Sequence, residues 1–320
     1  WGQYSEFEGI PFFNRSKIQR WTNRFSKEYR VANFKARGAY SGLYGSKVSN
    51  KPGLMQIRID AETAEKENGQ DTWRIYENVR KGVGYLGVFD AAEGATNPDD
   101  VQDKSFGAFF RLPLPDEVTL DGLPVLVATC RSTLPTVAFA RTCFPALRYY
   151  NNAVLAAERG HGKDNEAFGM TLEEWPFWYY YESRNAATKA LRPKKGFDTN
   201  AHTRTAMFLK LRDWMDFFEA DQDPHIYDKW IFSELAGAII KETPGGKRRC
   251  DHPRDGSLDG VICLGIGTYI VQETPEVVVC NQEEEKEKGG GFMQRMQAPV
   301  QSEKKHIPMG SGIARVGERA

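Results

Sequence analysis

The stretch that decides the fold class is PVLVATC, residues 124–130, which follows the turn pair Asp121-Gly122. An apolar run of this length after an Asp-Gly pair is typical of a buried strand that is entered through a β-hairpin. Upstream, Met55, Ile57 and Ile59 alternate with polar residues, which predicts a half-buried strand. Further strands are predicted at 72–76, 85–89, 106–112 and 117–120.

Beyond residue 134 the pattern changes to helical periodicity. Thr171 and Glu174 have the spacing of a capping box, which predicts a helix through the aromatic residues that follow. Two more helices are predicted at about 203–220 and 226–241, and strand character returns at 261–271 and 276–280. The predicted fold class is α+β, with a β-rich N-terminal half, a helical middle region, short closing strands and extended termini.

The chain is expected to divide into five regions. The last of them opens with the charged run 283–288 and holds too few apolar residues to fold alone, so we expect a partner outside the chain to hold it. The regions are a basic amphipathic docking segment and loop (1–50), a β-rich region (51–130), a helical region (131–243), a linker with closing strands (244–280) and an extended tail of low hydrophobicity (281–320).

Composition excludes some classes of protein. Forty-three basic and 43 acidic residues give a net charge of zero, which excludes a protein whose whole surface is a nucleic-acid footprint. No apolar run approaches the length of a membrane-spanning helix. The odd number of five cysteines fits a reducing compartment. We expect an organelle interior (chloroplast or mitochondrion) at the periphery of a membrane complex, with the cytoplasm as the alternative.

The segment 14–37 carries eight basic residues and one acidic residue. Its spacing predicts a helix with an aromatic face and a basic face. Such a helix could dock on an acidic protein, lie on an anionic membrane surface, bind nucleic acid or pack on its own domain. The zero net charge and the acidic tail argue against nucleic acid. The residues predicted to bind a partner here are Arg20, Trp21, Arg24, Phe25 and Tyr29.

The densest aromatic block, WPFWYYY, spans residues 175–181. On a helix these rings would point in all directions, so one core could not receive them all. We therefore expect a combination of core and interface, with Trp175 and Trp178 among the partner-binding residues. An alternative is a small-ligand pocket lined by Trp175, Trp178 and Trp214.

Cys250, His252 and Cys263 are the candidate metal ligands. Thiolates and an imidazole suit zinc, although the paired Cys-x-x-Cys spacing of zinc knuckles and ribbons is missing. A disulfide between Cys250 and Cys263, or plain reduced cysteines, are the alternatives. The acidic residues between 219 and 228 are interpreted as turn and helix-capping residues.

No catalytic constellation is recognisable, so the sequence favours a non-enzymatic accessory or structural subunit of a larger assembly. We expect a peripheral soluble subunit of an organellar membrane complex, with other protein subunits as partners and no nucleic acid. Proximity to a membrane surface, without a transmembrane helix, is part of this expectation. The alternatives are a metal-dependent enzyme or metal-stabilised domain using Cys250, His252 and Cys263, and a small-ligand binding module. No cofactor is predicted apart from zinc at that cluster.

Overall fold

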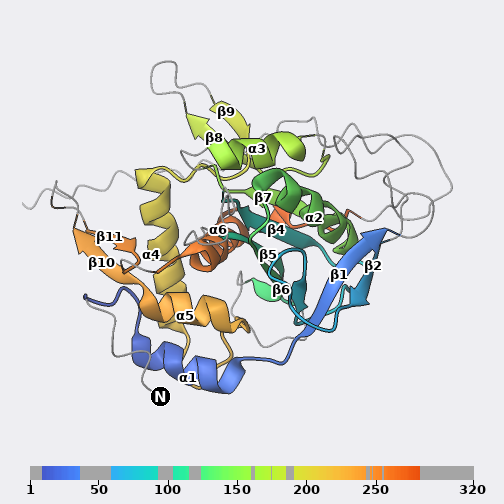
Figure 1. Ribbon diagram of the computed structural model, residues 1–320. Coiled ribbons are helices and arrows are strands. Elements are labelled where there is room, and N and C mark those ends of the chain that lie inside the picture. Colours follow the sequence, from blue (N-terminus) through green and yellow to red (C-terminus); the bar gives the residue numbers. More distant parts are fainter. Residues whose placement is uncertain are drawn as a thin grey trace, which may run out of the picture. The chain divides into compact units, whose positions relative to one another are not determined.

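The computed structural model describes residues 9–36, 59–92, 104–114, 124–159, 163–173, 175–184, 191–242, 246, 248–253 and 256–281. The chain divides into two compact units, 1–282 and 283–320, and all described residues belong to the first. This unit has the predicted α+β fold, with a large mixed sheet, two small sheets and helices (Figure 1). The predicted tail and the loop at 37–50 lie outside the described residues.

In the described part of the chain, the main sheet has seven strands in the order β2-β1-β3-β6-β5-β4-β7. Neighbouring strands run antiparallel, except β4 and β7, which are parallel. The small sheets pair β8 with β9 and β10 with β11. The strands are β1 (Arg30–Ala36), β2 (Ile59–Thr63), β3 (Trp73–Ile75), β4 (Tyr85–Asp90), β5 (Ser105–Arg111), β6 (Val125–Ser132), β7 (Val154–Ala157), β8 (Tyr180–Arg184), β9 (Leu191–Lys195), β10 (Ile239–Glu242) and β11 (Arg248–Asp251).

The predicted strands at 72–76, 85–89, 106–112 and 124–130 are confirmed as β3, β4, β5 and β6. Strand β5 is buried along its whole length and β6 nearly so, which explains why their sequences are continuous apolar runs. The predicted strand 117–120 and its Asp121-Gly122 turn lie outside the described residues, as does the start of the strand predicted at 55–60.

Helices cover both faces of the sheet, because alternate residues of its strands point to opposite sides. Leu86 and Val88 of β4 belong to one core, and Tyr85 and Phe89 to the other. The first core lies under α4, α5 and α6, and α2 with α3 covers the second (Figure 1). The helices are α1 (Arg15–Phe25), α2 (Thr136–Tyr149), α3 (Lys163–Thr171), α4 (Ala201–Phe217), α5 (Lys229–Gly237) and α6 (Asp259–Glu273), with a 3₁₀ turn at Pro275–Val277.

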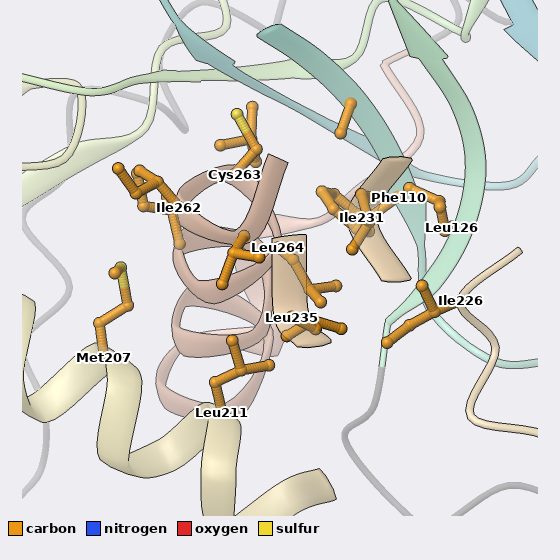
Figure 2. Packing of buried hydrophobic residues seen from close by; sticks show 14 of the residues in the cluster. Phe110, Leu126, Met207, Leu211, Ile226, Ile231, Leu235, Ile262, Cys263 and Leu264 are labelled. Atoms are coloured by element: carbon orange, nitrogen blue, oxygen red, sulfur yellow. The ribbon is translucent and has the colours of Figure 1, made fainter. Parts of the chain in front are cut away.

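The strand predicted at 261–271 is wrong, because this run is helix α6. An apolar run fits a buried strand or a helix that is buried all round, and periodicity alone does not separate them. Helix α6 is enclosed by the sheet, α4 and α5 (Figure 2). A Cβ on Gly267 would lie 2.8 Å from the ring of Phe110, so glycine lets the helix approach the sheet closely.

The helix predicted through the aromatic block is also wrong. Helix α3 ends at Thr171, and the chain then runs in an extended form beside β7. The N–H of Leu155 donates to the carbonyl of Phe177, and the N–H of Tyr179 donates to the carbonyl of Leu155, each at 2.8 Å. Extended backbone buries these rings against the sheet edge, which a helix could not do for successive residues.

The helix predicted at 203–220 is confirmed as α4, and the one at 226–241 is shorter than predicted. Helix α5 ends at Gly237, and the following residues form β10, which pairs with β11. Among the described helices, none is both long enough and apolar enough to cross a membrane.

Candidate active site

Two acidic residues stand at the ends of neighbouring parallel strands. Asp90 is the last residue of β4, and Glu158 directly follows β7. Phe89 and Ala157 are in register, and the N–H of Glu158 donates to the carbonyl of Phe89 at 2.8 Å. Because the carboxyl ends of parallel strands meet at one edge of a sheet, both side chains lie at that edge. Asn165 of α3 accepts the N–H of the following Ala91 at 3.1 Å and so fixes the end of β4.

A third acid, Asp259, begins α6 on the same side of the sheet. A Cβ on the next residue, Gly260, would lie 3.1 Å from the ring of Phe106. Phe106 is directly opposite Asp90 in the β4–β5 pair, so the start of α6 lies beside Asp90. Strand β4, the end of β7 and helix α6 therefore bring three carboxyl groups together from distant parts of the chain.

The electrostatics of the cluster follow from this crowding. Burial raises the pKa of Asp90 well above its usual value, and the neighbouring Glu158 and Asp259 raise it further. A side-chain hydrogen bond joins Asp90 to Glu158, and the positive charge of Arg204 acts in the opposite direction. Two carboxyl groups in hydrogen-bond contact need a proton between them, so the pair shares one in the absence of a cation.

Cys263 lies one turn after Asp259 on α6. Burial raises the pKa of its thiol well above the usual value, and the carboxylates of Asp90 and Glu158 add to that shift. The thiol is directed to the carbonyl of Phe106, at 3.7 Å. Cys263 is therefore a protonated, buried thiol that supports the base of the site.

Two arginines give the site its positive charge. Arg131 lies opposite Phe106, so Asp90, Phe106 and Arg131 form a row across β4, β5 and β6 on one face. The guanidinium of Arg131 is 3.4 Å from the hydroxyl of Ser257. Arg204, on α4, is close enough to lower the pKa of Asp90. Carboxylates flanked by arginines are suited to an anionic substrate bound next to a cation.

The donor chemistry of Asp90, Glu158 and Asp259 fits a hard divalent cation, because Mg²⁺ and Mn²⁺ prefer carboxylate oxygens. Across the described ranges, no three side chains of His, Cys, Asp or Glu are grouped so that they could hold a metal ion as they stand. The observed arrangement is a hydrogen-bonded pair with a third carboxylate nearby. Metal binding here requires the shared proton to leave.

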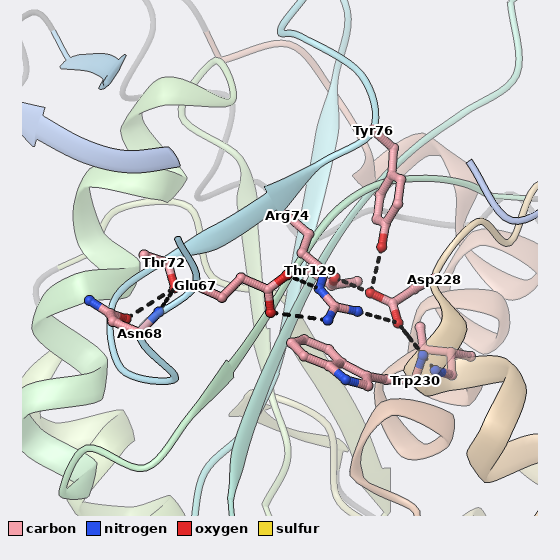
Figure 3. Close-up of polar contacts among 9 residues, drawn as sticks. Glu67, Asn68, Thr72, Arg74, Tyr76, Thr129, Asp228 and Trp230 are labelled. Atoms are coloured by element: carbon pink, nitrogen blue, oxygen red, sulfur yellow. Dashed lines mark hydrogen bonds and ion pairs between the residues drawn. The ribbon is translucent and has the colours of Figure 1, made fainter. Parts of the chain in front are cut away.

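A second buried polar cluster surrounds Asp228, and its bonds are saturated (Figure 3). One carboxylate oxygen accepts the N–H of Trp230 at 2.6 Å, which caps α5. The other accepts the hydroxyls of Tyr76, at 2.6 Å, and Thr129. Arg74 is 3.6 Å from Asp228, and its guanidinium stacks 3.1 Å from the ring centroid of Trp230. This cluster joins α5 to the sheet and leaves no side open to a ligand.

The predicted metal ligands are not assembled into a metal site. Cys250 is buried in β11, where burial raises the pKa of its thiol to about 12. The ring of His252 is 2.7 Å from the carbonyl of Pro253, and Cys263 is directed to Phe106. Cys250 and Cys263 are both free thiols, so the alternative disulfide is not formed. The zinc prediction fails because the two cysteines belong to different elements with separate surroundings.

The basic helix predicted at the N-terminus exists as α1, but its apolar face is turned inward. Trp21 is fully buried, and its indole N–H donates to the carbonyl of Glu219 at 3.3 Å. Phe25 is half-buried, and Tyr29 packs edge-on against Tyr76. Trp21 is therefore not a partner-binding residue, because the helix packs on its own domain. Arg20 and Arg24 are exposed and stay predictions.

The aromatic block is core as well. Trp175 and Trp178 are buried, and their indole N–H groups donate to the carbonyls of Ala153 and Leu172. With both rings and their polar atoms satisfied inside the domain, neither is available to a partner. Trp214, which was predicted to line a ligand pocket with them, is also buried, on α4 in the other core.

The three carboxylates escaped the sequence analysis. Asp90 and Glu158 each follow a short apolar run, YLGVF and VLAA, and an acid at the end of a buried strand is a signal that could have identified them. Asp259 precedes the apolar run of α6 and was interpreted as part of an Asp/Gly turn. Their proximity could not be read without the strand order.

The sequence matches no protein-family model and no curated protein. Three solved structures are similar to part of the chain. The large terminase nuclease of thermophilic phage G20c with bound magnesium is 14% identical, and the match covers 64% of this chain and 89% of that one, with a TM-score of 0.44. A second structure of that nuclease is 15% identical (64% and 90% covered, TM-score 0.44). The nuclease domain of the Thermus phage P74-26 large terminase is 14% identical (69% and 90%, TM-score 0.41).

These neighbours are nuclease domains of phage proteins. They contradict the expectation of a non-enzymatic accessory subunit of an organellar complex, and that expectation is withdrawn. The expected exclusion of nucleic acid has no support from them either. The compartment stays a prediction from the sequence.

Proposed function

We propose that this chain is a metal-dependent nuclease, which hydrolyses phosphodiester bonds of nucleic acid at Asp90, Glu158 and Asp259. The observation that supports this proposal is the convergence of three carboxyl groups from β4, the end of β7 and the start of α6. We rest it on these residues of the chain and not on the likeness to phage nuclease domains.

Asp90, Glu158 and Asp259 would hold the cations, since all three supply hard carboxylate oxygens. Bound divalent ions activate water and stabilise the attacking and leaving oxygens of a phosphoryl displacement. The chain contributes the rigid sheet edge that positions Asp90 and Glu158, and the buried surroundings that strengthen electrostatic interactions there.

The substrate class follows from the charge around the carboxylates. Arg131 is in the same cross-strand row as Asp90, two strands away, which corresponds to about 10 Å at the usual strand spacing. A guanidinium at that distance suits a phosphate next to the one that is cleaved, which requires a polymer rather than a small phosphomonoester. Arg204 supplies a second positive charge at the carboxylates.

The test is cleavage of supercoiled plasmid and of labelled single-stranded DNA and RNA by the purified chain, with Mg²⁺, with Mn²⁺ and with EDTA. We expect cleavage with either metal and none with EDTA. Asp90→Asn, Glu158→Gln and Asp259→Asn should each lower the rate by about 100-fold or more, because the lost stabilisation is several kcal/mol.

Asp213→Asn is the matched control, since Asp213 is an exposed aspartate on α4. It should cleave at the rate of the unchanged chain. Cleavage that persists in EDTA, or that survives all three active-site substitutions, would show that the activity comes from elsewhere. Hydrolysis of a phosphomonoester without cleavage of any polymer would replace the nuclease with a phosphatase.

A further inference from the structure

Helix α6 has no cap of its own. Its N-cap residue is Leu258, whose side chain makes no capping hydrogen bond. The first amides of a helix have no partner within the helix, so each needs an acceptor from elsewhere. Leucine cannot supply one, which leaves the start of α6, and with it Asp259, dependent on another element.

The missing acceptor comes from Glu234 on α5. Its Oε2 accepts the N–H of Gly260 at 2.8 Å and the N–H of Val261 at 3.1 Å. Its Oε1 accepts the hydroxyl of Ser257 at 2.9 Å. Both oxygens are thus used on the residues that flank Asp259. A carboxylate is also the favoured partner for a helix N-terminus, where the helix dipole is positive.

Helix α5 is itself fixed to the sheet. Asp228 caps its first turn and accepts hydroxyls from Tyr76, next to β3, and from Thr129 of β6 (Figure 3). One turn further, a Cβ on Gly260 would lie 3.1 Å from Ile231, so α5 and the start of α6 are in close contact. Two carboxylates, Asp228 and Glu234, therefore tie the start of α6 to the sheet that carries Asp90.

We propose that Glu234 is a positioning residue, which holds Asp259 in place relative to Asp90 and Glu158 by capping α6 from outside. This inference rests on the proposed function, because it acts through Asp259 as a metal ligand. Glu234 itself contacts helix amides and a hydroxyl and is not assigned to the metal. Its reach, rather than its charge, is what the site uses.

Two variants separate reach from charge. Glu234→Gln keeps the length of the side chain: its carbonyl oxygen can accept both amides, and its NH₂ can donate to Ser257. Glu234→Asp keeps the charge and is one methylene shorter, so it no longer reaches α6. Glu166→Asp, at an exposed position of α3, is the matched control for the glutamate-to-aspartate change.

The first measurement is the affinity of the full chain for Mn²⁺ alone, by titration calorimetry. Loss of a residue that orients a metal ligand typically weakens binding by about 10–100-fold, and we expect this for Glu234→Asp. Glu234→Gln and Glu166→Asp should bind Mn²⁺ within about threefold of the unchanged chain. In plasmid cleavage, Glu234→Asp should lower kcat while KM for DNA is unchanged.

The second measurement is amide hydrogen exchange over residues 259–263 without metal. Exchange should accelerate in Glu234→Asp and stay unchanged in Glu234→Gln. Unchanged exchange and Mn²⁺ affinity in Glu234→Asp would overturn the positioning role, and equal loss in both variants would make Glu234 a ligand instead. If the unchanged chain binds no Mn²⁺, the proposed function fails and the metal role of Glu234 with it, while exchange still decides whether Glu234 clamps α6.

Discussion

The carboxyl groups of Asp90 and Glu158 are joined by a hydrogen bond at the ends of two parallel strands. A fold that places two acids in contact inside a domain favours the protonated state of the pair. Burial and the neighbouring carboxylates raise the pKa of Asp90, and this sets how the stability of the metal-free chain depends on pH.

The first prediction concerns that dependence. The raised pKa of Asp90 means that the folded state holds its proton more tightly than the unfolded state. The stabilisation is complete below the ordinary aspartate pKa of about 4 and is lost as pH rises through the folded value. The Tm in EDTA should therefore fall from pH 5 towards neutral, and Asp90→Asn should reduce that fall and raise the Tm at neutral pH by at least about 2 °C.

The control is Asp213→Asn, which removes an exposed acid and should leave the pH dependence of the parent unchanged. Adding Mn²⁺ at neutral pH should raise the Tm of the parent and not that of Asp90→Asn. An identical pH slope in the parent and in Asp90→Asn would contradict the prediction.

The second prediction concerns the saturated cluster at Asp228. Asp228→Ala removes the cap of α5 and leaves Arg74 without one of its two carboxylate partners. Breaking a buried ion pair on one side costs about 3–5 kcal/mol, and we expect that loss in the free energy of unfolding. Chemical denaturation measures it. Asp221→Ala, an exposed acid in the same connection, should change stability by less than about 0.5 kcal/mol; equal losses in the two variants would rule out the network as the cause.

The third prediction uses two helical glycines with opposite surroundings. A Cβ at Gly267 would lie 2.8 Å from the buried ring of Phe110, and a Cβ at Gly169 of α3 would meet nothing within 4 Å. Gly267→Ala should therefore destabilise the chain by about 1–3 kcal/mol through overpacking. Gly169→Ala should stabilise it by about 0.5–1 kcal/mol through helix propensity. Thermal unfolding of both gives the signs, and the same sign for both would show that α6 does not approach β5 this closely.

The sequence was sufficient for the strands whose apolar runs are short and bounded, such as β5 and β6, and for α4 with its clear helical period. It was insufficient for α6, because an all-apolar helix enclosed by a sheet and two other helices has no polar face to reveal its period. The site was missed for a different reason. Asp90, Glu158 and Asp259 are brought together by the β4–β7 pairing and by the placement of α6, and neither relationship is encoded in local spacing.

The last prediction concerns Arg131, which shares a cross-strand row with Asp90 and Phe106. If it binds a phosphate of the substrate, Arg131→Ala should weaken binding of a DNA duplex without changing Mn²⁺ affinity. Each lost phosphate contact lowers the slope of log affinity against log salt by about 1. Fluorescence anisotropy at several salt concentrations, with cleavage blocked by EDTA, measures that slope.

Arg131→Lys should restore part of the affinity and the full salt slope, since it keeps the charge but loses the planar fork. Arg141→Ala is the control, because Arg141 is an exposed arginine on α2, which covers the opposite face of the sheet. If Arg131→Ala and Arg141→Ala lower the slope equally, the contact is a general effect of surface charge. An unchanged slope in Arg131→Ala alone would place the bound strand away from β6, along the side of the carboxylates where Arg204 lies.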